Sequence, residues 1–121
     1  MISLGEKGEK LAEKFLQKKG FVPITRRYKT PRWGEIDLIM RDGDTTVFVE
    51  VKTRSGGDGL FGGPLGAINY HKLKALRRTA QYYLSSQGLN WEAARIDAVA
   101  VVLKPGSSPE IEHYTDITSS L

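Results

Sequence analysis

Three ionisable side chains are spaced so that they could act together: Asp37 lies in one apolar run, and Glu50 and Lys52 lie in the next. Carboxylates suit Mg²⁺, which usually takes one or two of them and keeps waters and a substrate phosphate in its shell. Such a metal polarises a phosphoryl oxygen and activates a bound water. A lysine beside it could orient or deprotonate that water, or neutralise charge in the transition state. Together the residues suit phosphodiester hydrolysis with Mg²⁺ or Mn²⁺.

A β-hairpin would bring these side chains together. Residues 35–40 and 45–51 are rich in strand formers, and Gly43-Asp44 between them is a turn signal. A two-residue loop there places Asp37 directly across from Glu50, with Cβ atoms ~5 Å apart on one face. Lys52 returns to that face, and Val47, Val49 and Val51 take the other. A four-residue loop keeps this register, whereas a three-residue loop sends one carboxylate to the opposite face.

The alternative is a solvated hairpin with Glu50 and Lys52 on its wet face. Phe48 shares that face, and Ile39 flanks Asp37 on it, so the face is not uniformly polar. An isolated Glu-x-Lys triplet is common by chance, but here it is coupled to an Asp at matching register. This coupling favours a functional site.

Two amphipathic helices are expected around the hairpin. From Ser3 to Lys18, apolar residues gather into one arc at helical spacing, with Glu9 at its margin. Glu9 is either solvated or directed along the core edge towards the sheet. Gly5 and Gly8 either allow close backbone packing or mark a loose first turn.

The second helix is expected to begin at a cap on Asn69 and to run to Ser86. Lys72 lies inside its apolar arc, so it either extends to solvent or reaches an acidic neighbour or a phosphate. We favour the second, because carboxylates are expected nearby on the sheet. A buried strand at 95–103 and an edge strand at 110–114 should follow, with Asp97 in a structural role.

The net charge is +4 with a pI near 9.4, and several basic residues flank the hairpin. Tyr28 and Trp33 are interleaved with them and could stack on unpaired bases. The alternative is a solvated basic face. We expect nucleic-acid contacts from Arg26, Arg27, Arg32, Arg54 and Lys72. The glycine-rich segment 55–64 is interpreted either as a mobile loop beside the site or as a flexible linker.

The chain of 121 residues is long enough for one domain, residues 1–121. The order helix, strand, hairpin, helix, strand, strand predicts an α/β fold with a mixed central sheet flanked by helices. Cysteine is absent, the N-terminal residues do not have the pattern of a signal peptide, and no apolar run is long enough for a bilayer. These features predict a cytoplasmic protein with no membrane partner.

The segments 34–39 and 47–54 closely resemble the YraN-like family of small bacterial proteins, UPF0102, within the restriction-endonuclease-like PD-(D/E)xK superfamily. That superfamily also includes the archaeal Holliday junction resolvases, to which the chain is similar. Further matches are Gly5, Gly8-Glu9, Ala12, Leu16, Lys72, Tyr83-Leu84 and Arg95-Ile96-Asp97. The resemblance implies that Asp37 and Glu50 bind metal, that Lys52 is the motif lysine and that Glu9 is a further catalytic acid. One departure is Arg27, where such sequences often carry Asn, and it bears on substrate contact.

Two functions are consistent with these patterns. The first is a Mg²⁺- or Mn²⁺-dependent endonuclease acting on branched or structured DNA, for which a homodimer is expected because a resolvase nicks paired strands. The second is a nucleic-acid-binding protein of the same fold whose cleavage is weak, absent or dependent on a partner. The acidic residues favour the first, because carboxylates repel phosphate and would not help a pure binder.

Overall fold

The computed structural model describes residues 1–56 and 69–120. Two helices and five strands follow in the order α1, β1, β2, β3, α2, β4, β5. Their bounds are α1 Leu4–Lys18, β1 Val22–Thr30, β2 Gly34–Asp42, β3 Thr45–Ser55, α2 Tyr70–Ser86, β4 Ala94–Leu103 and β5 Glu110–Tyr114. Short 3₁₀ helices span Trp91–Ala93 and Ile117–Ser120. The predicted single-domain α/β fold is confirmed, and it is compatible with a restriction-endonuclease-like fold.

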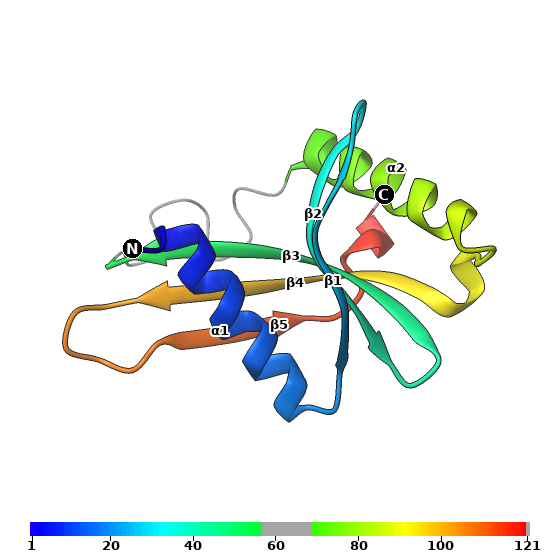
Figure 1. Cartoon of the computed structure of the whole chain (residues 1–121). Coiled ribbons are helices and arrows are strands. Elements are labelled where there is room, and N and C mark those ends of the chain that lie inside the picture. The colour runs from blue at the N-terminus through cyan, green and yellow to red at the C-terminus, as the bar shows by residue number, and fades with distance from the viewer. Residues whose placement is uncertain (57–68, 121) are drawn as a thin grey trace.

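The five strands form one mixed sheet in the order β1-β2-β3-β4-β5. Neighbouring strands are antiparallel except β3 and β4, which pair in parallel and are joined through α2. A parallel pair requires such a crossover, whereas the β2–β3 pair needs only the tight turn at Gly43-Asp44. The long β1–β2 hairpin twists away from the other strands, and its tip rises beside α2 (Figure 1).

The two helices cover opposite faces of the sheet (Figure 1). One core cluster joins Ala12 and Leu16 of α1 to Val47, Val49 and Val51 of β3. The other joins Leu73, Leu76 and Leu84 of α2 to Ile39 and Phe48. The valines and Phe48 therefore take opposite faces, as the period of two predicts.

Both helices begin with the caps that their sequences supply. The Ser3 hydroxyl accepts a hydrogen bond from the Glu6 N–H, and the Asn69 side chain accepts one from the Lys72 N–H. α1 also lies very close to β3, because a Cβ atom placed on Gly8 would lie 2.8 Å from Cβ of Thr53. Close backbone packing is therefore the role of Gly8, whereas a Cβ on Gly5 would come no closer than 3.9 Å to the Ser3 hydroxyl.

From Gly57 onward, the glycine-rich segment interpreted as a mobile loop or linker lies outside the described residues. Among the described residues, neither helix combines the length and the apolar character needed to cross a membrane.

Candidate active site

β2 and β3 separate just before the two acidic residues. Their register runs from Asp42 opposite Thr45 to Leu38 opposite Val49, so the loop has two residues and the count leads on to Asp37 and Glu50. β3 continues to pair with β4 as far as Ser55, whereas its pairing with β2 ends at Val49, opposite Leu38. The Asp37 side chain takes over the next position, because its Oδ2 accepts a hydrogen bond of 2.8 Å from the Val51 N–H.

This arrangement differs from simple strand alternation. Ile36 and Ile39 both pack in the core cluster beneath α2 although they are three residues apart, and Leu38 packs in the opposite cluster. Alternation along β2 is therefore interrupted around Asp37. The Asp37 carboxylate accepts a hydrogen bond from the backbone of the adjacent strand, so it lies in the seam between β2 and β3. The sequence had predicted that it would stand on the same face of the sheet as Ile39.

Glu50 projects beneath α2 and meets two lysines. Glu50 is only 3% exposed. Lys52 Nζ lies 3.5 Å and Lys72 Nζ 3.4 Å from the same oxygen, Oε2. Lys72 therefore reaches an acidic neighbour on the sheet, which is one of the partners expected for it, and its role in a site stays a prediction. A buried carboxylate requires such compensation, because leaving it unpaired would cost several kcal/mol.

Asp37 has the opposite electrostatic situation. Burial and the negative charge of nearby Glu50 together raise the pKa of its carboxyl to about 7, even though the hydrogen bond from the Val51 N–H lowers it. Glu9 also contributes to the higher pKa. Near neutral pH the fold thus holds a carboxyl group that resists ionisation beside a second carboxylate, which is an arrangement that a cation would relieve.

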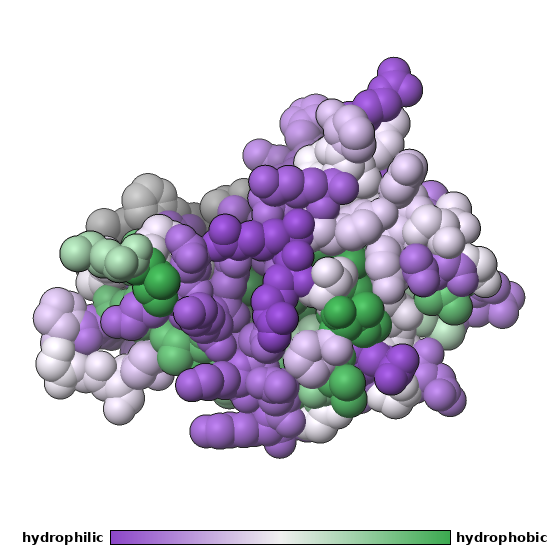
Figure 2. Space-filling model, in the orientation of Figure 1, coloured by the Kyte–Doolittle hydropathy of each residue, from purple (hydrophilic) through white to green (hydrophobic). Residues whose placement is uncertain are grey.

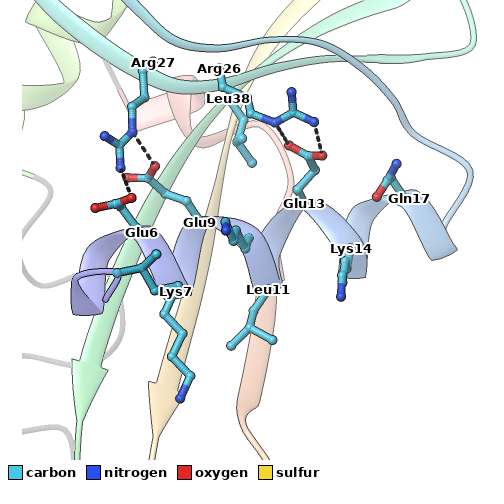
Figure 3. Close-up of a pocket in the computed structure, with 12 residues that line it drawn as sticks. Glu6, Lys7, Glu9, Leu11, Glu13, Lys14, Gln17, Arg26, Arg27 and Leu38 are labelled. Atoms are coloured by element: carbon cyan, nitrogen blue, oxygen red, sulfur yellow. Dashed lines mark hydrogen bonds and ion pairs between the residues drawn. The ribbon is translucent and has the colours of Figure 1, made fainter.

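Glu9 lies on the α1 side of the sheet and already has a partner. Its Oε1 accepts a hydrogen bond of 3.2 Å from Arg27 Nε, and Arg27 also lies 3.8 Å from Glu6 (Figure 3). The backbone of Arg27 has a φ of 51°, in the left-handed region. Asn adopts this conformation more readily than most residues, which gives a physical reason for an Asn at this position in similar sequences.

The donor chemistry of Asp37 and Glu50 suits a magnesium or manganese ion, because two carboxylates are an ordinary Mg²⁺ ligand set. The raised pKa of Asp37 supports this fit. In residues 1–56 and 69–120, no group of three acidic or histidine side chains converges closely enough to hold a metal ion. Glu9 is therefore not drawn in as a third ligand in this conformation.

Of the residues expected to bind nucleic acid, Arg26 and Arg27 line a groove of about 560 Å³ between α1 and β1. Arg26 makes two hydrogen bonds of 2.6 Å to the Glu13 carboxylate, and Figure 3 shows both arginines directed at acids of α1. Of the predicted catalytic residues, only Glu9 lines this groove. The groove and the acid pair are therefore separate features.

Tyr28, which was expected to stack on bases, packs instead in the core. Its ring lies 5.2 Å from that of Tyr83 in an edge-to-face contact. Trp33 and Arg32 lie in the β1–β2 turn, where the Arg32 guanidinium is 5.5 Å from the indole ring. Arg54 is half-buried near the end of β3.

Comparison with known proteins identifies the family. The model of "Uncharacterised protein family UPF0102" matches residues 8–101. This chain belongs to family UPF0102. A UPF0102 protein of Nocardia farcinica is 43% identical over 111 residues, covering 92% of this chain and 85% of the relative. One from Rhodococcus jostii is 39% identical over 95% of both chains, and one from Solibacter usitatus is 42% identical over 89% of this chain and 80% of the relative.

Within this UPF0102 chain, one polar cluster went beyond what the sequence indicated. Asp97 was expected to be structural, and it does pair with Arg95. It also contacts His113 of β5, whose Nε2 lies 2.8 Å from Asp97 Oδ2, and it accepts a hydrogen bond from the Asp116 N–H. Lys19 adds a contact of 3.0 Å to the other nitrogen of that histidine. The only sequence signal was an acid at the start of an otherwise apolar strand.

Proposed function

We propose that this protein is an endonuclease that cuts branched or structured DNA with Mg²⁺ or Mn²⁺ held by Asp37 and Glu50. The observation that carries the proposal is the placement of these two carboxyl groups side by side, with the pKa of Asp37 raised to about 7. Folding gains nothing from a half-buried acid placed beside a buried one. Their retention is explained if a cation binds between them during the reaction.

The chain's own residues have distinct tasks in this proposal. A bound metal would supply Lewis-acid activation of the phosphate and of a water. The Val51 N–H holds the Asp37 carboxyl in the seam, and Glu50 holds the Lys52 ammonium group 3.5 Å away. Lys52 then orients or deprotonates the attacking water, or neutralises charge on the phosphoryl oxygens. Glu9 assists from α1 once its ion pair with Arg27 is broken and its carboxylate is free to act at the site.

Lys72 approaches the same Glu50 oxygen from α2, and its side chain is still 42% exposed. A partly exposed ammonium group can turn towards a phosphate without losing all of its hydration. We assign Lys72 to substrate contact, where it would keep the nucleic-acid backbone against the acid pair.

A second function is favoured by one specific observation. Lys52 and Lys72 already neutralise Glu50 without a metal ion, and the described residues hold no third metal ligand close to the pair. A protein that binds nucleic acid, with cleavage that is weak, absent or dependent on a partner, would use the same contacts. Cleavage assays separate the two functions.

The test incubates purified protein with labelled four-way junctions, flaps, duplexes and RNA, in Mg²⁺, Mn²⁺ or chelator. We expect metal-dependent products from a branched or structured DNA, and at least a hundredfold less product from Asp37→Asn and Lys52→Ala. Asp44→Asn is the matched control, because it makes the same change in the exposed turn of the same hairpin. Unchanged binding without metal-dependent products from any substrate would favour the second function, and equal cutting by Asp37→Asn would reveal a contaminant.

Cutting of paired strands also implies two sites. We propose a homodimer, in keeping with the two opposed nicks that junction resolution needs. Light scattering with and without junction DNA tests this directly, and a monomer on the junction that still makes paired nicks would contradict it.

A further inference from the structure

Two sets of exposed cations have different surroundings. Arg26 and Arg27 are paired with acids of α1. Arg32, Lys74 and Arg78 instead lie against aromatic rings, and in the part of the chain that the structure describes they form no ion pair with a carboxylate. These three cations are therefore available to an anionic partner, and each has an aromatic ring beside it.

Two of these cations, Lys74 and Arg78, form a continuous line with Tyr70 on α2. Tyr70, Lys74 and Arg78 are spaced by four residues, so they share one face of the helix over about 12 Å. Tyr70 is 59% exposed, and Lys74 Nζ lies 5.3 Å from its ring. The Arg78 guanidinium lies 4.8 Å from the ring of Trp33. This contact extends the line from the helix onto the β1–β2 turn.

We call the five residues Arg32, Trp33, Tyr70, Lys74 and Arg78 the aromatic-cationic strip. In Figure 1 the β1–β2 tip stands beside α2, and Figure 2 shows hydrophilic residues over that tip. Lys72 lies between Tyr70 and Lys74 in the sequence and contacts Glu50. The helix that carries most of the strip therefore also reaches the acid pair.

We propose that the aromatic-cationic strip binds unpaired nucleotides of single-stranded DNA and directs an adjoining strand to the acid pair. Guanidinium and ammonium groups attract phosphates, and rings beside them accept bases by stacking. A continuous duplex keeps its base faces stacked inside, so it cannot use the rings. This inference rests on the proposed function for its substrate class, although the binding it describes requires no cleavage.

The test measures binding of a labelled oligothymidine and of a duplex of equal length, in chelator so that nothing is cut. We expect tighter binding to the single strand, and Trp33→Ala and Arg78→Ala should each weaken it about tenfold. Trp33→Phe should recover most of the affinity, because a ring remains. Lys104→Ala is the matched control and should change the affinity less than about twofold, since that cation is already paired with Glu110.

Fluorescence gives a second readout that a merely structural role would not produce. The chain has two tryptophans, so in a Trp91→Phe variant the emission reports on Trp33 alone. Stacking of a base on this indole should quench it on addition of the single strand, but not of the duplex. Urea unfolding of each variant confirms that it is folded.

The proposal is overturned if Trp33→Ala binds the single strand as tightly as the parent, if Lys104→Ala weakens binding as much as Arg78→Ala, or if duplex binds equally well. Failure of the proposed nuclease gives a different pattern. In that case the strip variants still lose single-strand binding, while no substrate yields metal-dependent products. Cleavage that depends on Asp37, together with strip variants that bind normally, overturns the strip alone.

Discussion

Two acidic clusters lie on neighbouring strands of one sheet, and they are built in opposite ways. Asp97 of β4 pairs in register with Val49 of β3, one residue before Glu50. It is fully buried, yet its carboxylate accepts hydrogen bonds from Arg95 Nε at 2.9 Å and from the Asp116 N–H at 2.9 Å. The His113 ring adds a third contact.

The histidine proton can be assigned from its neighbours. Lys19 has only donors to offer, so Nδ1 of His113 accepts from Lys19 Nζ, and Nε2–H donates to Asp97. The Asp97 cluster is thus satisfied by donors on every side. Asp37, by contrast, has one backbone donor and faces another acid. The difference shows that burial alone does not mark a functional acid, whereas incomplete compensation does.

The largest change in the free energy of unfolding is expected on substitution of Asp97, and it would test the contrast between Asp97 and Asp37. Asp97→Asn removes the negative charge, and its amide N–H₂ would confront the Arg95 and His113 donors. We expect a loss of about 3–5 kcal/mol in the free energy of unfolding, measured in urea at pH 7. Asp44→Asn is the control and should stay within about 0.5 kcal/mol. A loss below about 1 kcal/mol at Asp97 would mean that the cluster contributes little to stability.

The second effect concerns the distance between α1 and the acid pair. Gly8→Ala places a methyl group against the Thr53 side chain, so the helix must shift away from β3. We expect a loss of about 1–3 kcal/mol from this overpacking. Gly5→Ala, in the same helix but with open space around it, should be neutral or slightly stabilising. Equal effects at both glycines would contradict the close packing of α1 on β3.

The third effect should have the opposite sign to that at Asp97. Asp37→Asn keeps an acceptor for the Val51 N–H but removes the charge beside Glu50. We expect the variant to be more stable than the parent by about 1–2 kcal/mol at pH 8. The pKa of Asp37 is about 7 in the folded protein against an ordinary value of 3.8, so folding takes up a proton between these pH values.

The contribution of Asp37 to the unfolding free energy of the parent should therefore fall as the pH rises from about 4 to about 7, and then level off. The advantage of Asp37→Asn should accordingly be small at pH 4 and full at pH 8. Urea unfolding across this range checks both the sign and the window. An advantage that is constant with pH would show that Asp37 does not titrate as described.

The smallest effect provides a reference for an ion pair with one exposed partner. Arg26 is paired with Glu13, but its side chain is 64% exposed. A double-mutant cycle of Arg26→Ala and Glu13→Ala should give a coupling of about 1 kcal/mol or less in the unfolding free energy. A coupling as large as the loss at Asp97 would remove the distinction between buried and exposed pairs.

Local sequence rules were sufficient for most of the fold. The Gly43-Asp44 turn fixes the register of β2 and β3, and Ser3 and Asn69 mark the helix starts. The β5 strand has the predicted bounds, Glu110–Tyr114. These features depend on residues close in the chain, where turn chemistry, capping and periodicity act directly.

The remaining features depend on contacts between distant segments. The break in alternation at Asp37 arises because β3 leaves β2 to continue along β4. The partners of Arg26 and Arg27 are on α1, and Tyr28 is half-buried because α2 places Tyr83 beside it. Neither the charge of a residue nor its neighbours in sequence determines which acid or ring folding brings to it.

The central claim is that Asp37 and Glu50 bind a divalent cation, and calorimetric titration with Mn²⁺ at pH 6.5 tests it most directly. Buffers of different ionisation enthalpy report proton release, which is expected because Asp37, with a pKa of about 7, is partly protonated at that pH. We predict Mn²⁺ binding with proton release for the parent and for Asp44→Asn, and affinity at least tenfold weaker for Asp37→Asn. Equal uptake by Asp37→Asn, or no uptake by any of the three proteins, would contradict the account.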